Sequence, residues 1–237
     1  MRHHSANLIR RSSRIIPNQI PTDNLLSHWA FTEGSGYTIH DTGSCAHNLV
    51  DGNQAGTWIA GKENGYGYRL TGVQLFTTSS TGYPSGQNAP ITLSTFVKFY
   101  TIINTYNIMS WCWGDARSSL IFGVISTTKK IVAGINGIYD LYNGSSGLGN
   151  TITTPSDWIH LCFVYDPAHT IYANRMNVFI NGENILTDND YFPFVIVNGI
   201  GIKIGQLYQV VDAAVSATRV YGRPLTLAEV NAIAHSP

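Results

Sequence analysis

Side chains fall into two alternating sets, with a period of two, along much of the chain, and the clearest example is residues 158–165. The two alternating sets are Trp158, His160, Cys162 and Val164, and Ile159, Leu161, Phe163 and Tyr165. Neither set is polar enough to face water. The pattern therefore predicts a strand in the centre of a packed sheet.

A hairpin is predicted after this strand. Asp166 and Pro167 end the strand, because proline lacks the amide hydrogen that a ladder needs. The chain is expected to return over residues 176–180. Asn181 and Gly182 are typical of a tight type I′ turn, since both tolerate a positive φ, and residues 183–186 should then pair back.

Further strands are predicted at a spacing of about ten residues, with turns rich in glycine, asparagine and serine. They cover residues 25–31, 37–40, 66–70, 73–77, 91–100, 108–113, 120–125, 130–135 and 214–221. This spacing, without a helical period, indicates an all-β sandwich or barrel. A chain of 237 residues with 43% hydrophobic content can form one such domain, which we place at residues 25–237.

One helix is predicted near the C-terminus. Thr226 and Glu229 form a capping box, and Leu225 with Val230 can form a hydrophobic staple. The helix is short and should end by His235. We expect it to close one edge of the sandwich after the last strand.

Charge is divided unevenly between residues 1–22 and the rest of the chain. Of 14 basic residues, Arg2, Arg10, Arg11 and Arg14 precede Asp23, the first acidic residue, which leaves ten basic against 14 acidic residues in the body. We expect residues 1–24 to form a basic arm that binds other protein subunits. A mitochondrial presequence and an unstructured leader are the alternatives. Four arginines without interleaved aromatic residues predict no specific nucleic-acid binding, and no apolar run has the length of a signal peptide or of a membrane span.

Three segments carry a family resemblance: HWAFTEGSGYTIHDTGS near the start, DWIHLCFVYD with VFINGE in the middle, and ATRVYGRPLTLAEVNAI near the end. In this order they resemble the laminin-G-like, concanavalin A-like lectin domains over residues 25–235. The resemblance implies a jelly-roll sandwich of two antiparallel sheets. It selects no single function, because the family includes glycan binders, adhesins, interaction modules, virion proteins and a few enzymes. The arm followed directly by such a domain also resembles small proteins of tailed bacteriophages.

The sequence offers no pair of carboxylates suited to glycoside hydrolysis. Enzymes that share this fold carry E-x-D-x-x-E on one strand, and the motif is absent here. The glutamates lie far apart in the sequence, and Asp188 with Asp190 is typical of a turn. We therefore predict that the protein is not an enzyme.

The same resemblance implies a calcium ion at an edge of the sandwich. Calcium takes oxygen ligands from carboxylates and amides, and Asp41, Asn48 and Asp212 are the candidates. The alternative is that Asp41 and Asn48 only organise a turn. The eight histidines show no zinc spacing, and the three cysteines are expected to be reduced, with Cys112 and Cys162 buried.

Tyrosines in predicted loops are the candidates for contacts with a sugar. An exposed ring can stack on the apolar face of a sugar while neighbouring polar groups bind its hydroxyls. The candidates are Tyr83, Tyr106, Tyr139 and Tyr142, with Tyr172 and Tyr208 in similar loops. The alternative is that each ring packs and keeps only its hydroxyl in water.

Together these patterns favour a non-catalytic recognition protein. We expect the protein to be a subunit of a virion or other extracellular assembly. Its basic arm would dock on the assembly, and its lectin-like sandwich would stay exposed and could bind a glycan. The alternative is a soluble carbohydrate-binding lectin or adhesin without an assembly role.

Overall fold

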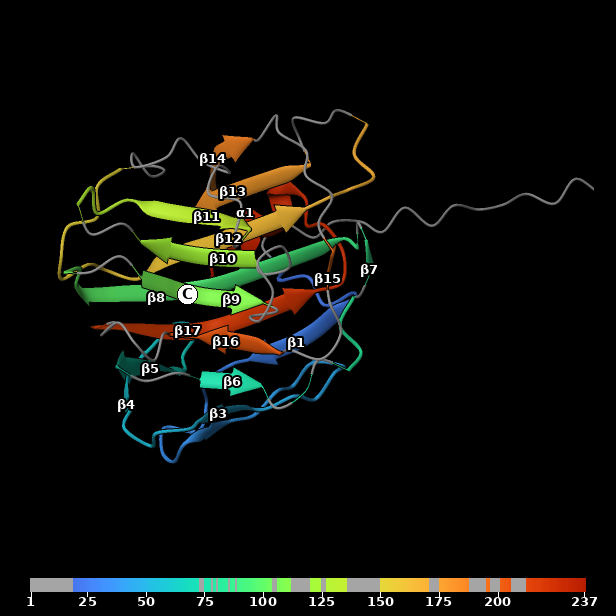
Figure 1. Ribbon diagram of the computed structural model, residues 1–237. Helices are drawn as coiled ribbons and strands as arrows, with labels where there is room; N and C mark the ends of the chain where they lie inside the picture. The colour runs from blue at the N-terminus through green and yellow to red at the C-terminus, as the bar shows by residue number, and fades with distance from the viewer. Residues whose placement is uncertain are drawn as a thin grey trace, which may run out of the picture.

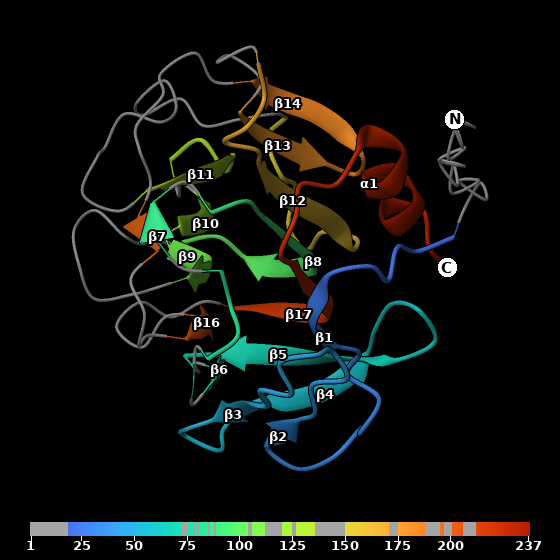
Figure 2. The ribbon, with the colours of Figure 1, turned by 90° about the vertical axis from the view of Figure 1, so that its right-hand side faces the viewer.

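Two antiparallel β-sheets lie face to face in the computed structural model of the protein (Figure 1). The structure describes residues 19–72, 75–77, 79, 81–84, 86–87, 89–103, 106–111, 120–124, 127–135, 150–170, 175–187, 195–196, 201–205 and 212–237. A single helix in these ranges lies outside the sheets (Figure 2). The all-β jelly-roll sandwich expected from the sequence is confirmed.

The larger sheet has eight strands. In spatial order they are β14 (Glu183–Thr187), β13 (Met176–Ile180), β12 (Ile159–Tyr165), β8 (Ile91–Thr101), β17 (Asp212–Tyr221), β5 (Tyr66–Thr71) and β4 (Thr57–Ala60), with β1 (Leu25–Trp29) also paired to β17. Strands β8 and β17 are the longest and form the middle of the sheet, so they set the positions of the loops at both ends.

The smaller sheet has seven strands. In spatial order they are β11 (Ile131–Ile135), β10 (Leu120–Val124), β9 (Tyr106–Trp111), β16 (Ile202–Ile204), β6 (Leu75–Thr77), β3 (Leu49–Asp51) and β2 (Thr38–Ile39). A separate pair joins β15 (Val195–Ile196) to β7 (Gly86–Gln87).

The predicted central hairpin is confirmed. Strand β12 pairs with β8 on one side and β13 on the other, and every residue from His160 to Tyr165 is buried. Asn181 and Gly182 have φ of 51° and 84°, as a tight turn between β13 and β14 requires. Trp158, which the sequence placed in the strand, lies just before it and is only partly buried, in the layer outside the sheet.

The core between the sheets is built by the side chains that alternate inward along each strand. Leu93, Val97 and Phe99 of β8 meet Leu161 and Phe163 of β12 in one cluster with residues of the smaller sheet, such as Leu49, Leu75 and Ile204. Period-two alternation puts every second side chain on this face. The inward-facing set of hydrophobic side chains therefore forms the core between the sheets, as the pattern predicts.

A second hydrophobic cluster covers the outer face of the larger sheet. Val230 and Ile233 of helix α1 (Leu227–Ala234) pack with Phe96, Cys162 and Phe179 there. The sequence had suggested that the helix closes an edge of the sandwich, and this was wrong: the helix covers a face of the larger sheet. The reason is that β12 has apolar side chains on both of its faces. The capping box of Thr226 and Glu229 is present as predicted.

Residues 20–23, which the sequence assigned to the arm, contact the body. Ile20 packs against the outer cluster, Tyr221 Oη donates to Pro21 O at 3.1 Å, and Asp23 pairs with Arg223 at 2.7 Å. The arginines of the arm, Arg2, Arg10, Arg11 and Arg14, lie outside the described residues. Among the described residues no helix has the length and apolar character needed to cross a membrane.

Candidate functional site

Three aromatic residues lie on the segments where the β4–β5 hairpin meets the loop before β2. We call Tyr37, Trp58 and Tyr66 the aromatic edge. The rings of Trp58 and Tyr66 are 6.2 Å apart in an edge-to-face arrangement, and Trp58 Nε1 donates to the carbonyl of Gly36, next to Tyr37, at 2.8 Å. Tyr37 and Tyr66 are 43% and 44% exposed. Tyr66 thus reaches solvent beside a tryptophan that is also bonded to the loop of the exposed Tyr37.

Glycine makes this arrangement possible. Gly34 has a φ of 66°, and a Cβ built on it would lie 2.7 Å from the Tyr66 ring. The ring therefore packs directly on the backbone of the loop, where a side chain would push it away. Tyr66 N–H also donates to the carbonyl of Phe31 at 2.8 Å, so the hairpin and the loop are joined.

Hydrogen bonds hold the loop that carries Tyr37. His40 N–H donates to Glu33 Oε1 at 2.8 Å, and the His40 ring Nδ1 is 3.0 Å from the same oxygen. The His40 side chain is 66% exposed. Asp51 N–H donates to the carbonyl of Tyr37 at 2.9 Å. The aromatic edge therefore has a hydrogen-bonding imidazole on its own loop.

Asp51 is the buried anchor behind this surface. Its carboxylate accepts four backbone N–H groups, from residues 53, 54, 55 and 56, at 2.9 to 3.1 Å, and the hydroxyl of Tyr68 at 2.7 Å. Burial and this bond to Asp51 raise the pKa of Tyr68. The Tyr68 ring lies 5.1 Å from Trp58, so Asp51 fixes the floor on which Trp58 rests.

Two hollows open elsewhere on the described surface. The first, of about 550 Å³, lies between the edges of the two sheets and is lined by Ile131, Asn150, Thr151, Ile152, Thr153, Pro155, Ser156, Asp157, Ile159, Ile180, Asn181, Glu183 and Ile185. We call it the isoleucine hollow. The second, of about 440 Å³, lies between the start of α1 and strands β12 to β14 and has Asn177, Phe179 and Asn184 in its lining.

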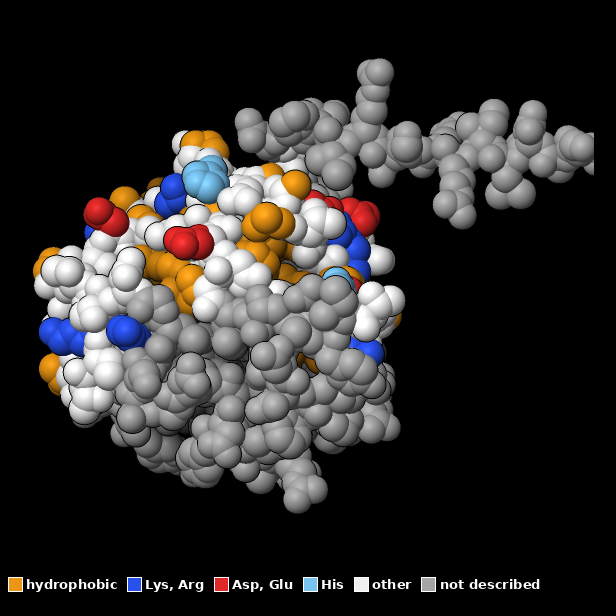
Figure 3. Space-filling model, turned by 90° about the horizontal axis from the view of Figure 1, so that it is seen from above, with side chains coloured by type: hydrophobic (Ala, Val, Ile, Leu, Met, Phe, Trp, Pro, Cys, Tyr) orange, Lys and Arg blue, Asp and Glu red, His pale blue; other side chains and the backbone are white. Residues whose placement is uncertain are grey.

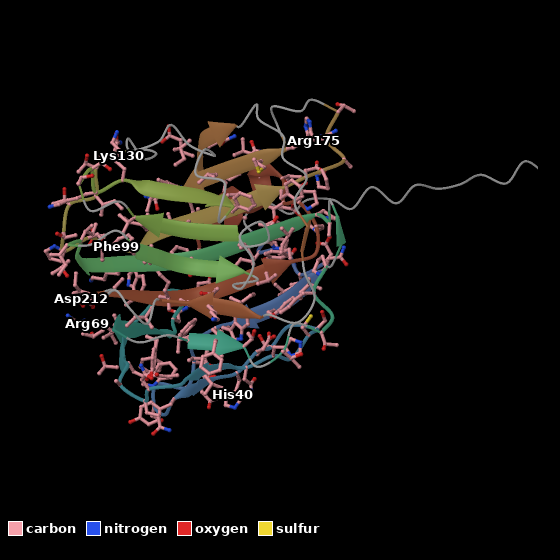
Figure 4. All side chains as sticks on the ribbon, viewed as in Figure 1. His40, Arg69, Phe99, Lys130, Arg175 and Asp212 are labelled. Atoms are coloured by element: carbon pink, nitrogen blue, oxygen red, sulfur yellow. The ribbon has the colours of Figure 1, made fainter. Side chains whose placement is uncertain are left out.

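The three predicted calcium ligands are not brought together. Asp41 and Asn48 are neighbours, with Asp41 N–H donating to Asn48 Oδ1 at 3.0 Å. Asp41 is bridged to Trp29 of β1, which pairs with the C-terminal part of β17. Asp212 begins β17 and so lies at the opposite end of that strand. There it accepts two hydrogen bonds from Arg69, at 2.9 and 3.1 Å (Figure 4).

Asp41 acts as the organiser of its loop. Its carboxylate accepts N–H groups from His28 at 2.8 Å, Gly43 at 2.7 Å and His47 at 2.9 Å. Such bonds are expected if Asp41 organises a turn, which was the alternative to calcium binding. In the described ranges no group of three or more histidine, cysteine or acidic side chains is arranged to hold a metal. Calcium binding at Asp41 and Asn48 stays a prediction.

Of the predicted sugar-contacting tyrosines, Tyr83 is in the core. It is 6% exposed, and its hydroxyl lies 2.7 Å from Ser27 Oγ, so it cannot stack on a ligand. Tyr106 begins strand β9, and its side chain lies outside the described set, as do all of Tyr139, Tyr142, Tyr172 and Tyr208. Sequence reasoning missed Tyr37 and Tyr66. Their available signal was the glycine-rich turn that precedes Tyr37.

One serine–histidine pair in the described structure has the spacing of a nucleophile and its base. Ser94 Oγ and His160 Nε2 are 2.8 Å apart, but both residues are fully buried, and among the described residues His160 Nδ1 has no partner. Burial and nearby Arg219 lower the pKa of His160 to about 3. The pair is neutral at pH 7, and no substrate can reach it in this fold.

The cysteines that the structure describes, Cys45 and Cys162, are free. Cys162 is fully buried, and burial raises the pKa of its thiol, as predicted for a small buried side chain. Cys112 lies outside the described residues.

Comparison with known proteins relates the whole fold to lectin-like sandwiches. A family model described as the concanavalin A-like lectin/glucanases superfamily matches residues 70–231. The sialidase of Trypanosoma rangeli in complex with the inhibitor DANA matches with a TM-score of 0.63 at 12% identity, over 91% of this chain and 33% of the sialidase. A point mutant of HCR/D matches with a TM-score of 0.62 at 12% identity, over 91% of this chain and 52% of that one.

This chain therefore spans about a third of the length of the sialidase and about half of the HCR/D chain. At this identity the two structures establish the fold alone. No curated protein matches the sequence.

Proposed function

The chain belongs to the concanavalin A-like lectin/glucanases superfamily, and from that premise we propose that it recognises a carbohydrate through the aromatic edge. One observation carries the proposal. The described residues expose four large hydrophobic side chains, and two of them, Tyr37 and Tyr66, lie in segments that contact Trp58: Tyr66 through its ring, and the Tyr37 loop through the carbonyl of Gly36. An exposed tyrosine offers a sugar an apolar ring face for stacking and a hydroxyl for hydrogen bonds.

The aromatic edge provides both parts of sugar recognition. The C–H groups of a pyranose can pack on the rings of Tyr37 and Tyr66, and the tyrosine hydroxyls and the exposed imidazole of His40 can bind its hydroxyls. Because Trp58 and Gly34 already fix the position of Tyr66, little side-chain entropy is lost on binding. No step of bond cleavage is part of the proposal.

Sialidases share the fold, and one solved structure holds sialic acid. This chain covers a third of that sialidase, so the likeness supports the fold and supplies neither a sugar site nor a catalytic residue to this chain. The charge division along the chain supports a further part of the proposal, that the basic segment before Asp23 attaches the sandwich to an assembly such as a virion and leaves the aromatic edge exposed.

The proposal is tested with a panel of neutral and acidic polysaccharides in affinity electrophoresis. Tyr37→Ala and Tyr66→Ala should each weaken binding to the retained polysaccharide roughly tenfold or more, as expected for an aromatic contact. Tyr37→Phe and Tyr66→Phe keep the ring and should retain most of the affinity. Leu227→Ala, at an exposed position on α1, is the matched control. Alanine variants that bind like the wild type, or a panel without any retained polysaccharide, would refute the proposal.

A further inference from the structure

The isoleucine hollow has a composition unlike that of a sugar site. Its floor is formed by isoleucines from both sheets and from the loop between them: Ile131, Ile152, Ile159, Ile180 and Ile185. No aromatic side chain is in its described lining. Asp157 and Glu183 line it as well, and both residues are exposed. Figure 3 views the β14 side of the molecule and shows hydrophobic side chains at the surface beside acidic ones.

The charge of this lining has one sign. Asp157 and Glu183 are its charged residues, and no lysine, arginine or histidine is in the described lining. Lys129 and Lys130 are not in this lining, but they border it, since the Ile152 N–H donates to the Lys129 carbonyl at 2.8 Å. A ligand with aliphatic groups for the floor and positive charge for Asp157 and Glu183 complements the lining itself.

We propose that the isoleucine hollow binds the segment Arg14-Ile15-Ile16 from the arm of a second copy of this chain. The segment offers two adjacent aliphatic side chains with an arginine beside them. Arg10 and Arg11 precede Arg14 by four and three residues. The isoleucines would enter the floor, and the arginines would pair with Asp157 and Glu183. The proposal is independent of sugar recognition at the aromatic edge.

Chain geometry indicates that the segment comes from another copy. The described chain is held at Pro21, which accepts a hydrogen bond from Tyr221 at the end of β17, and Tyr221 pairs with Thr92 near the start of β8. Ser156 of the hollow instead bonds to Phe99, seven residues further along β8. Ile180, also in the hollow, pairs with Leu161 and so lies level with Thr95, three residues along β8. Three to seven residues of strand span roughly 10 to 20 Å, and the three strand spacings from β17 to β13 add about 15 Å across the sheet, so the hollow lies on the order of 20 Å from Tyr221.

Ile16 could approach the hollow of its own chain only if residues 16–21 were fully extended along a straight line. It precedes Pro21 by five residues, which reach at most about 17 Å when fully extended. The floor isoleucines also belong to the cluster between the sheets, whereas Ile20 packs in the cluster outside the larger sheet. The path around the sheet is therefore longer than the straight line. Exchange of arms between two copies satisfies both constraints and closes a dimer.

A charge exchange tests the proposal in the full-length protein. One variant reverses the rim, Asp157→Lys with Glu183→Lys, and the other reverses the arm, Arg10→Glu with Arg11→Glu and Arg14→Glu. Each variant alone should sediment as a monomer at concentrations where the wild type is a dimer. An equal mixture should recover the dimer, because each arm then meets a rim of opposite charge. Recovery in the mixture also proves that both variants are folded.

The apolar part of the contact is tested separately. Ile15→Ser with Ile16→Ser changes no residue of the body and should abolish the dimer at the same concentrations. A labelled peptide of residues 8–18 should bind the arm-reversed variant, and Asp157→Asn with Glu183→Gln in that variant should weaken its binding about tenfold. Asp166→Asn in the same variant, outside the hollow, is the control and should leave the peptide affinity unchanged.

The outcomes are distinct. A wild-type protein that stays monomeric over a wide concentration range and a peptide that does not bind would overturn the proposal. A mixture of the two charge variants that fails to associate would overturn it as well, as would a peptide whose binding ignores the rim substitutions. None of these results depends on whether a polysaccharide binds the aromatic edge.

Discussion

Arg219 of β17 and Glu63 of the β4–β5 turn form an ion pair beneath the C-terminal residues. The Arg219 side chain is 2% exposed and that of Glu63 is 16% exposed. Ser236 Oγ donates to the other oxygen of Glu63 at 2.7 Å, and Glu63 N–H donates to the carbonyl of Pro237 at 2.7 Å. One carboxylate thus joins the middle of the larger sheet, the hairpin that carries the aromatic edge and the end of the chain.

Removal of Glu63 should therefore be costly. Glu63→Ala leaves the guanidinium of Arg219 buried without its partner, and the free energy of unfolding should fall by about 3–5 kcal/mol. Asp212→Ala breaks the Arg69 pair, whose side chains are 36% and 18% exposed, and should cost less than about 1 kcal/mol. Urea unfolding of the two variants measures the difference. Equal midpoints would contradict the buried character of the Arg219 pair.

Partly buried His28 and fully buried His160 should make stability depend on pH. Burial and then Arg219 lower the pKa of His28 to about 4, and the same causes lower the pKa of His160 to about 3. In the unfolded chain both titrate near 6.5. Above about pH 6.5 both states are neutral. Below it the histidines are protonated in the unfolded state but not in the folded state. The free energy of unfolding should therefore fall with falling pH, by up to about 1.4 kcal/mol per pH unit for each histidine.

Urea midpoints between about pH 7 and pH 5 check this dependence, since most carboxylates stay ionised there. His160→Gln should remove about half of the slope. A flat profile for the wild type, or a slope that His160→Gln leaves unchanged, would contradict the assignment to His28 and His160.

Asp51 should be among the residues whose loss costs most. Asp51→Ala leaves four backbone N–H groups and the Tyr68 hydroxyl without their acceptor, and the free energy of unfolding should fall by at least about 3 kcal/mol. Tyr68→Phe removes one of these bonds and should cost about 1 kcal/mol. Thermal unfolding ranks the two. A Tyr68→Phe variant that is as damaged as Asp51→Ala would show that the loop does not depend on the carboxylate.

The elements that the sequence predicted well are those fixed by neighbours in the chain. Asn181 with Gly182 and Thr226 with Glu229 act over two to four residues, so the hairpin and the helix cap were evident. The place of the helix was not, because it depends on Phe96, Cys162 and Phe179 forming an apolar row on the outer face, which only the assembled sheet reveals.

The candidate site residues were predicted less well, because their surroundings are set by tertiary contacts. Asp212 was grouped with Asp41 by residue type, but strand pairing brings it to Arg69, which is 143 positions away in the sequence. Tyr83 is in a polar stretch of the sequence, yet its hydroxyl meets Ser27 in the core. Trp58 packs against both the exposed Tyr66 and the buried Tyr68, and so separates the Tyr66 ring from the core. Exposure of a ring is decided by its tertiary neighbours, so the glycine-rich turn before Tyr37 was a weak signal for it.

Hydroxyl-radical footprinting with and without a saturating polysaccharide tests carbohydrate recognition at the aromatic edge most directly. Four large hydrophobic side chains of the described surface are exposed enough to be labelled, namely Tyr37, Tyr66, Ile103 and Leu227. The account predicts that the ligand protects Tyr37 and Tyr66 and leaves Ile103 and Leu227 at their unbound rates. Protection of Ile103 or Leu227 with unchanged labelling of the two tyrosines would contradict it.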